Sequence, residues 1–439
     1  MNTYLVGGAI RDEMLGLKGA DKDWVVVGST PEAMISLGYT PVGKDFPVFL
    51  HPKSGQEYAL ARTERKSGKG YTGFVVHAAP DVTLEEDLQR RDLTINAMAR
   101  ADDGTLIDPY GGARDLDARL LRHVSPAFSE DPLRILRVAR FAARFHAQGF
   151  EVAAETMTLM RDMSQSGELQ ALTPERIWQE MHKTLQHDDC PVFFEVLREC
   201  GALKEIMPEL DRLFGIPQPP QWHPEVDTGV HTLMVLKQAC LLTQETDVRF
   251  AALVHDLGKG ETPAEMWPSH RGHETLGLKP IKALCQRLKV PRSASELACL
   301  TSEFHTHVHR ALSLKPSTLL KTLEKLDAFR RPERFQQFLL ACKADSRGRT
   351  GFEQIPYLQA NHFQAALDAS KGIAVPELLE RFPVPEGQVA GPHIQSILRE
   401  ARLSAIRHYC KNTPYKPDAV PARTSRKAPP GDKRREAIP

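Results

Sequence analysis

The sequence predicts an α+β protein in which a small α/β head is followed by a neck and body built of helices. Short β-branched runs concentrate in residues 1–125, whereas from Asp131 onward apolar residues recur at spacings of three and four. The first pattern is typical of strands and the second of amphipathic helices. A third observation is that eight of the 17 histidines fall between His223 and His309, within a further helical segment.

Residues 1–125 form the predicted head. Strands are expected where short apolar runs are bounded by glycine, proline or charge, at Tyr4–Val6, Trp24–Val27, Val48–Leu50 and Glu57–Leu60. A helix is expected at Ala9–Leu15, directly after Gly7-Gly8.

Residues 126–222 form the predicted neck and body, with helices at Asp131–Phe145, Thr156–Met163, Thr173–Gln186 and Val192–Cys200. Ser129, ahead of Asp131-Pro132, and Thr173, ahead of Pro174, are start signals. A proline-rich break at 216–220 precedes the histidine segment, residues 223–350, and more helix is expected over 351–410. The remaining residues, 411–439, contain six prolines and are expected to form a disordered tail.

The composition excludes several classes of protein. The net charge of the 439 residues is +1, which argues against a uniformly basic coat for nucleic acid, and no apolar run approaches the roughly 20 residues that span a bilayer. The tail carries eight basic and three acidic residues, so residues 1–410 are slightly acidic. Seven scattered cysteines and the absence of a visible signal peptide lead us to expect a reduced, cytoplasmic protein.

Two features of the head are suited to phosphate chemistry. Gly7-Gly8 follows a strand and opens a helix, where backbone N–H groups can approach an anion, and Arg11 adds a charged donor. Asp21 and Asp23 enter the next strand two residues apart, so their carboxylates share one face. Paired carboxylates repel one another unless a cation lies between them, and hard oxygen ligands suit Mg²⁺.

These residues resemble a known signature. Residues 5–12 with Asp21-x-Asp23 are similar to the nucleotidyltransferase motif of the polymerase-β superfamily. Residues 90–97 narrow the resemblance to class II tRNA nucleotidyltransferases and related bacterial poly(A) polymerases, and the motifs at 108–112, 130–134 and 173–176 follow in that family's order. With the histidine segment, the chain resembles bacterial CCA-adding enzymes that carry an HD domain.

The resemblance implies a polymerase-β-type head and a template-independent reaction. The 3′-hydroxyl of a tRNA lacking all or part of its CCA end would attack the α-phosphate of CTP or ATP in line, with Mg²⁺ held by the catalytic residues Asp21 and Asp23. Nucleotide binding would fall to Gly8, Arg11, Arg91, Arg137 and Arg140. A third carboxylate is expected, with Glu57 as first choice and Asp92 as second.

The predicted helix at 131–145 carries a stripe of arginines. Arg134, Arg137, Arg140 and Arg144 fall within an arc of about 120°. Apart from Glu130 near Arg134, no acid lies four residues away to offset them, so a triphosphate or RNA backbone is the expected counter-charge.

Asp131 and Arg134 suggest how a base is selected. Asp accepts and Arg donates hydrogen bonds, a pair that matches the amino group and ring nitrogen of cytosine or adenine. Uracil and guanine present the reverse pattern and would be left unpaired. The resemblance implies that these two residues choose CTP and ATP without a nucleic-acid template.

The histidine segment contains a second motif. His255-Asp256 ends an apolar run, and His231 lies 24 residues upstream. This arrangement resembles the HD phosphohydrolases, which implies a divalent metal held by His231, His255, Asp256 and a later aspartate, for which Asp345 fits. Mixed imidazole and carboxylate ligands suit a transition metal such as Ni²⁺. The implied activities are those of a phosphatase, a 2′-nucleotidase and a 2′,3′-cyclic phosphodiesterase.

His270, His273 and His305 are secondary candidates for a further metal or phosphate contact. Two alternative functions remain open: a poly(A) polymerase, and a catalytically dead module that binds RNA or nucleotides. The resemblance is compatible with a monomer or a homodimer, and no membrane partner is expected.

Overall fold

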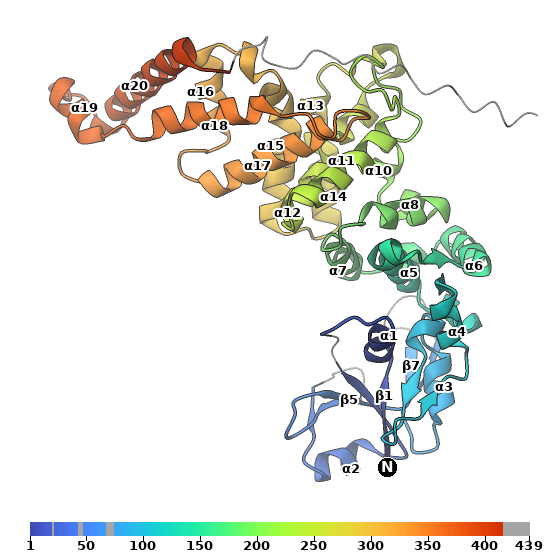
Figure 1. Cartoon of the computed structure of the whole chain (residues 1–439). Coiled ribbons are helices and arrows are strands. Elements are labelled where there is room, and N and C mark those ends of the chain that lie inside the picture. The colour runs from blue at the N-terminus through green and yellow to red at the C-terminus, as the bar shows by residue number, and fades with distance from the viewer. Residues whose placement is uncertain (20–21, 43–46, 67–73, 416–439) are drawn as a thin grey trace, which may run out of the picture. The chain divides into compact units, whose positions relative to one another are not determined.

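The computed structural model describes residues 1–19, 22–42, 47–66 and 74–415. Asp21 and the predicted tail from residue 416 onward therefore lie outside the described residues. The chain divides into two units, Met1–Glu303 with Ala344–Gln354, and Phe304–Lys343 with Ile355–Pro439. Figure 1 labels the elements of both units. None of the described helices is long and apolar enough to cross a membrane.

The head contains a mixed sheet of seven strands in the order β3-β4-β5-β2-β1-β8-β9. Its strands are β1 Asn2–Val6, β2 Asp23–Val27, β3 Thr40–Pro41, β4 Val48–Leu50, β5 Glu57–Leu60, β8 Ala99–Arg100 and β9 Leu106–Ile107. Strands β2 and β5 run parallel, and the other neighbours run antiparallel. All four predicted strands are present, and two have the predicted bounds.

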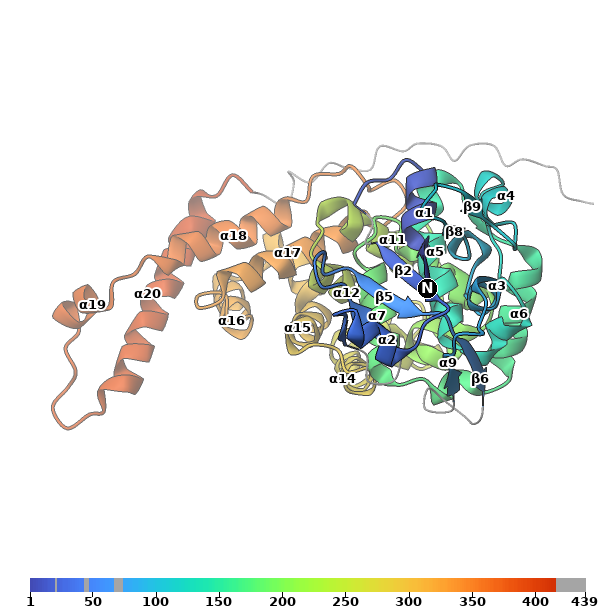
Figure 2. The ribbon, with the colours of Figure 1, turned by 90° about the horizontal axis from the view of Figure 1, so that it is seen from below.

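The register places acidic residues at one end of the sheet. Asp23, the first residue of β2, pairs with Val6 on one side and with Glu57 of β5 on the other. Figure 2 shows β2 and β5 lying beside one another. Since residues in register on neighbouring strands point to the same face, Asp23 and Glu57 share a face.

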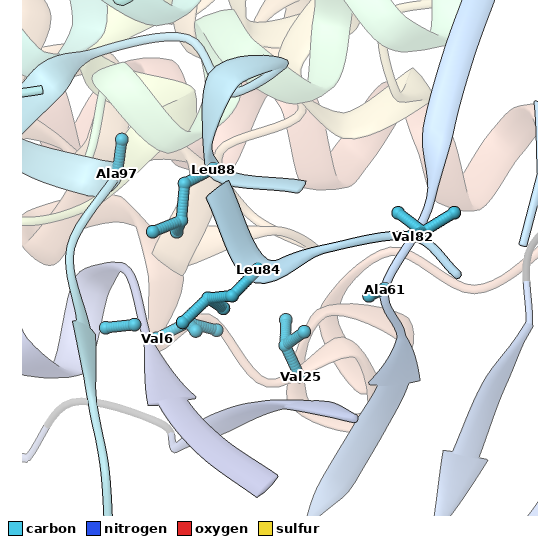
Figure 3. Close-up of a cluster of buried hydrophobic side chains, with 8 residues drawn as sticks. Val6, Val25, Ala61, Val82, Leu84, Leu88 and Ala97 are labelled. Carbon is cyan, nitrogen blue, oxygen red and sulfur yellow. The ribbon is translucent and has the colours of Figure 1, made fainter. Parts of the chain in front are cut away.

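One hydrophobic core of the head is formed between the sheet and α3 (Leu84–Gln89). Figure 3 shows Leu84 and Leu88 of this helix directed toward Val6 and Val25 of the central strands. The side chain of Thr83 caps α3 by accepting a hydrogen bond from the Glu86 backbone N–H, and the Glu86 carboxylate accepts one from the Thr83 backbone N–H. This capping box fixes the start of the helix, and with it the position of Arg90 and Arg91 at its end.

The turn between β1 and α1 (Gly8–Met14) requires glycine. Gly7 has a φ of +69°, and a Cβ added there would lie 2.8 Å from Nη1 of Arg91. Gly7-Gly8 therefore lets an arginine approach the backbone closely. The other head elements are α2 Pro31–Ser36, the two-stranded sheet of β6 Thr63–Lys66 and β7 Phe74–His77, and α4 Gly112–Asp117.

The neck is formed by four helices, α5 Leu133–Phe145, α6 Ala154–Gln165, α7 Pro174–Thr184 and α8 Pro191–Glu199. Each lies within two residues of its predicted bounds at both ends, and helix α5 packs against α7 and α8. The start signal at Ser129 is wrong: Ser129 lies in the short 3₁₀ turn Pro126–Glu130, and the Asp131 side chain instead accepts a bond from the backbone of Leu133. Smaller elements complete the neck, namely the parallel pair β10 Leu120–Leu121 and β11 Glu151–Val152, then α9 Ala202–Ile206 and α10 Pro208–Asp211.

The histidine segment of the first unit begins with α11 (Thr228–Leu242), whose first turn is capped by Asp227. Helix α12 (Thr246–Val254) packs against it through a core of Val235, Ala239, Ala252 and Ala344. Helices α13 His273–Leu276 and α14 Leu278–Arg287 follow. The boundary between the two units falls within α15 (Arg292–His309) and α17 (Pro332–Arg347), so that Asp345 belongs to the first unit.

The second unit is helical in its described part. It contains α16 Pro316–Lys325, α18 Leu358–Lys371, α19 Val375–Arg381 and α20 Ala390–Asn412, with α18 lying beside α20 in both views (Figures 1 and 2). Phe335 packs against Phe338 and Phe363 in its core. Helix α20 continues two residues past the predicted boundary at 410.

Candidate active sites

A cavity of about 630 Å³ lies between the sheet edge of the head and helices α5 and α7 of the neck. It brings together every transferase residue predicted from the sequence that the structure describes, namely Gly8, Arg11, Asp23, Arg91, Asp131, Arg134, Arg137 and Arg140. Asp21 lies outside the described residues. Nine arginines but four carboxylates line the cavity, so its walls carry an excess of positive charge. We call it the arginine-lined cavity.

The two carboxylates on the floor of this cavity come from neighbouring strands. Asp23 and Glu57 both line it, and they are register partners on the parallel strands β2 and β5. Carboxylate oxygens from adjacent strands on one face suit a hard divalent cation. A shared face and a shared cavity therefore make Glu57 the better placed of the two candidates for a third carboxylate.

Asp92, the second candidate, is already engaged. Its Oδ2 accepts from Nε of Arg137 at 2.7 Å, and its Oδ1 accepts from Nδ2 of Asn96 at 3.0 Å and from the backbone of Leu93 at 2.8 Å. Burial would raise the pKa of Asp92, but the Arg137 charge and these hydrogen bonds hold it well below its usual range. Asp92 therefore serves to hold an arginine.

The arginine stripe of α5 is offset by acids that lie far away in the sequence. Arg137 pairs with Asp92, Arg140 Nε donates to Glu180 at 2.6 Å, and Arg144 Nη2 donates to Asp12 at 2.8 Å. The inference that a bound polyanion alone would balance the stripe is therefore wrong for these three residues. Helical spacing reveals only acids on the same helix. The pairs instead orient the guanidinium groups that face the cavity.

Arg11 is held behind the β1–α1 turn. Its Nε donates to Oδ1 of Asp12 at 2.8 Å, and its Nη1 donates to Oδ1 of Asn96 at 2.5 Å. Burial lowers the pKa of Arg11, although the Asp12 charge opposes this shift. Arg91 is similarly fixed, by Asp87 Oδ2 at 3.2 Å and by the Asn96 carbonyl at 3.3 Å. Hydrogen bonds within the protein therefore hold both guanidinium groups in place at the wall of the cavity.

Asp131 and Arg134 are both positioned at the start of α5. Oδ2 of Asp131 accepts from Nη2 of Arg176 at 2.8 Å, and Oδ1 accepts from the Leu133 backbone at 3.1 Å. Arg134 donates to the carbonyls of Ala127 at 2.6 Å and Arg90 at 2.5 Å. Sequence reasoning placed Arg176 in a motif without giving it a role, and the structure shows that it holds Asp131.

The second site gathers residues from α11, from the end of α12 and from α17. His231, His255 and Asp345 offer ligand atoms within 4.8 Å of one another, and all three are buried. Nε2 of His231 lies 3.3 Å from Oδ1 of Asp345, and Nε2 of His255 lies 3.2 Å from Oδ2 of Asp256. The four residues predicted from the sequence therefore converge. We call them the HD cluster.

The hydrogen bonds of the HD cluster suit a cation. Nδ1 of His255 donates to the Ala252 carbonyl at 2.8 Å, and Nδ1 of His231 lies 3.1 Å from the Gly348 carbonyl. With both Nδ1 atoms protonated, the Nε2 lone pairs face carboxylates, an unfavourable contact unless a positive charge lies between them. Among the described residues, Nε2 of His231 makes no hydrogen bond. Against the effect of burial, the same preference for positive charge raises the pKa of His255 to about 10, through Asp256 and Asp345, so that either a proton on Nε2 or a metal ion in its place can supply this charge.

Several contacts around the HD cluster were not predicted. Lys259 Nζ lies 2.5 Å from Oδ2 of Asp256 and donates to Gln218, and Glu225 Oε1 lies 3.0 Å from Nδ1 of His231. Lys259 follows His255-Asp256 closely enough for sequence inspection to have found it, whereas Glu225 belongs to no recognisable motif.

The secondary histidine candidates have different positions. His273 Nε2 lies 3.3 Å from Oδ1 of Asp256, so His273 belongs beside the HD cluster. His270 bonds to the Thr262 hydroxyl at 2.7 Å and to the Pro217 carbonyl at 2.8 Å, which are contacts within the protein framework. His305 belongs to the second unit, where its ring packs against His309.

Three family models match the chain. They are the poly A polymerase head domain at residues 3–122, the probable RNA and SrmB-binding site of polymerase A at residues 149–214, and the HD domain at residues 228–331.

Curated relatives match almost the full length. A multifunctional CCA protein of Pseudomonas fluorescens is 59% identical over 409 residues, covering 93% of this chain and 98% of the relative. Another, from Thioalkalivibrio sulfidiphilus, is 60% identical over 407 residues, again with 93% and 98% coverage.

Solved structures share the fold. A CCA-adding enzyme in an apo form aligns with a TM-score of 0.64 at 22% identity, covering 93% of this chain and 90% of the other. The Thermotoga maritima CCA-adding enzyme complexed with tRNA aligns with a TM-score of 0.60 at 20% identity, covering 93% and 91%. A complex of a CCA-adding enzyme with ATP gives 0.61 at 19% identity, covering 94% and 91%.

Proposed function

The chain belongs to the family of multifunctional CCA proteins, and on that basis we propose that it adds and repairs the 3′-terminal CCA of tRNA from CTP and ATP, without a template. The arginine-lined cavity carries the proposal, because it combines a carboxylate pair, Asp23 and Glu57, with an excess of arginine. Such a site accepts a triphosphate and a divalent cation together. The names of the relatives support the same reaction.

Each part of the cavity has a proposed task. Asp23, with Asp21 and Glu57, would hold Mg²⁺, which supplies Lewis-acid stabilisation of the phosphate charge. The cation-rich wall, which includes Arg11, Arg91, Arg137 and Arg140, would bind the triphosphate, and Gly8 leaves room beside it. The RNA 3′-hydroxyl would then attack the α-phosphate and pyrophosphate would leave.

Base choice is assigned to Asp131 and Arg134. The carboxylate accepts from the exocyclic amino group of cytosine or adenine, and the guanidinium donates to the ring nitrogen. Arg176 supports this task, because it holds Asp131 at 2.8 Å. The duplex part of the tRNA would be recognised by shape and phosphate contacts along the helices.

The proposal is tested with three tRNA substrates, which end before CCA, after C and after CC. Each is incubated with CTP alone, with ATP alone and with both. We expect CTP to extend the first two only as far as CC, and ATP to complete the third by one residue. Long A-tails from ATP alone would identify a poly(A) polymerase instead. Nucleotide binding without any extension would identify a dead module.

We propose a second, hydrolytic activity for the HD cluster, directed at phosphomonoesters, 2′-nucleotides and 2′,3′-cyclic phosphates. His231, His255, Asp256 and Asp345 would hold a divalent transition metal, with Ni²⁺ as the first candidate. The metal would supply Lewis-acid activation of water and phosphate. Lys259 Nζ lies 2.5 Å from Oδ2 of Asp256, and this lysine would offer a cation to the phosphate group of the substrate.

Phosphate release with added Ni²⁺ or Mg²⁺ tests the hydrolytic activity. We expect chelation to abolish it and added metal to restore it. A His255→Ala, Asp256→Ala double variant should lose hydrolysis and keep CCA addition, because the two sites share no residue. Hydrolysis that survives in the double variant would refute the assignment.

A further inference from the structure

Glu225 occupies an unusual position beside the HD cluster. Its side chain is 2% exposed, and its Oε1 lies 3.0 Å from Nδ1 of His231 and 3.0 Å from Nδ1 of His223. Its other oxygen, Oε2, accepts from the backbone N–H of Thr350 at 3.3 Å. One buried carboxylate thus contacts two imidazoles and the chain segment that follows Asp345.

The tautomer of His231 follows from these contacts. Its Nδ1 lies between two acceptors, Oε1 of Glu225 and the Gly348 carbonyl at 3.1 Å. An unprotonated nitrogen would face two oxygens with its lone pair, so Nδ1 carries the hydrogen. Nε2 is therefore the atom with a free lone pair, and it is directed toward Asp345 and Asp256, at 3.3 and 3.9 Å.

From this geometry we propose that Glu225 is a positioning residue, which orients His231 so that its Nε2 ligates the metal of the HD cluster. The inference rests on the hydrolytic function proposed above. Carboxylates that accept from the second nitrogen of a metal-bound histidine fix the ring and strengthen it as a ligand, and losing them typically weakens metal binding 10- to 100-fold.

His223 shares Oε1 of Glu225, which raises a competing arrangement in which His223, Glu225 and His231 hold an ion among themselves. Such an ion would have to displace the hydrogen on Nδ1 of His231 and leave the Gly348 carbonyl without its donor. The hydrogen-bond arrangement therefore favours a supporting carboxylate over a ligand. The ring of His223 packs edge-on against His231, 4.6 Å between centroids.

The test uses the full-length protein with Co²⁺ as probe, read by calorimetry and by its visible absorption spectrum. We expect Glu225→Ala to weaken Co²⁺ binding roughly 10- to 100-fold and to change the spectrum, with Glu225→Gln intermediate because the amide keeps one acceptor. His223→Ala should bind within about twofold of wild type. Glu209→Gln removes a carboxylate paired with Arg287 at 2.7 Å outside the HD cluster and is the matched control.

The outcomes distinguish the positioning role of Glu225 from the proposed metal site of the HD cluster. Far-UV circular dichroism and the midpoint of urea unfolding, compared between each variant and wild type, report whether the chain is folded, so a loss of Co²⁺ binding in Glu225→Gln with both unchanged is not due to unfolding. Wild-type affinity and spectrum in Glu225→Ala would overturn the positioning role alone. An equal loss in His223→Ala would overturn it in favour of the competing arrangement. Co²⁺ binding that is the same in the His255→Ala, Asp256→Ala variant would overturn the metal site itself.

Discussion

Arg137 on α5 and Asp92 after α3 form an ion pair, 2.7 Å between Nε and Oδ2, that joins the neck helix to the head across the arginine-lined cavity. Asp92 is buried, whereas about a third of the Arg137 side chain remains exposed. The pair therefore stabilises the junction of head and neck while leaving the guanidinium available to a nucleotide.

Replacing Asp92 with Asn should destabilise this junction. We expect a loss of about 2 kcal/mol in the free energy of unfolding, measured in urea, because the partly exposed Arg137 loses its buried counter-charge. The KM for CTP should rise as well. An Asp92→Asn, Arg137→Gln double variant should recover part of the stability, since neither charge is left unpaired; additive losses would contradict the coupling.

Asp23 and Glu57 should both be needed for transfer. Asp23→Asn and Glu57→Gln are each expected to lower CTP incorporation roughly 100- to 1000-fold, while phosphate release by the HD cluster stays unchanged. Glu32→Gln, at an exposed position in the first turn of α2, is the control. If Glu57→Gln transfers normally and only Asp23→Asn fails, the third carboxylate lies elsewhere.

Asp131→Asn should relax the choice of base. An amide can both donate and accept, so uracil and guanine would no longer be left unpaired. We expect the preference for CTP over UTP to fall roughly 10- to 100-fold, measured as the ratio of kcat/KM values on a tRNA that lacks CCA. The neighbouring Glu130→Gln should keep the wild-type preference. An unchanged ratio in Asp131→Asn would remove Asp131 from base recognition.

His187 should make the fold sensitive to acid. Burial, together with the charges of Arg144, Arg140 and Arg249, lowers its pKa to about 4. A histidine with a lowered pKa contributes its full stability above the unfolded pKa of about 6.5 and loses it as the pH falls toward the folded value. Between pH 6.5 and 4 the wild type should lose about 2 kcal/mol more than His187→Gln, after allowing for partial exposure. Parallel urea-unfolding profiles would contradict this.

Gly258 should be needed for the HD cluster to form, but not for CCA addition. A Cβ at Gly258 would lie 1.9 Å from the His273 carbonyl, whereas one at Gly260 would meet only side-chain atoms, at 3.4 Å or more. We expect Gly258→Ala to lose about 3 kcal/mol of stability and most phosphate release, with CCA addition retained. Gly260→Ala should resemble wild type. Equal behaviour of the two variants would show that the backbone at 258 can move.

The sequence was most informative where a local pattern carries the information. Short apolar runs bounded by glycine, proline or charge located β4 and β5 at their bounds, and apolar residues at spacings of three and four located α5 to α8 within two residues. Motif order along the chain led to the family, and the spacing of the arginines on one helix predicted that they share one face.

Long-range contacts decided what the sequence left open. The acids that pair with the arginines of α5 come from other elements and are Asp12, Asp92 and Glu180. Strand register places Glu57 beside Asp23, whereas Asp92 pairs with Arg137.

By itself, then, the sequence determined the order of head, neck and HD motifs and the residue types available for chemistry, since these depend on neighbours a few positions apart. The tertiary structure alone decided which acid pairs with which base, that Arg176 contacts Asp131 and that Glu225 contacts His231. The physical reason is that ion pairs and hydrogen bonds act over a few ångströms in space, and only folding brings residues 6 to 132 positions apart into that range.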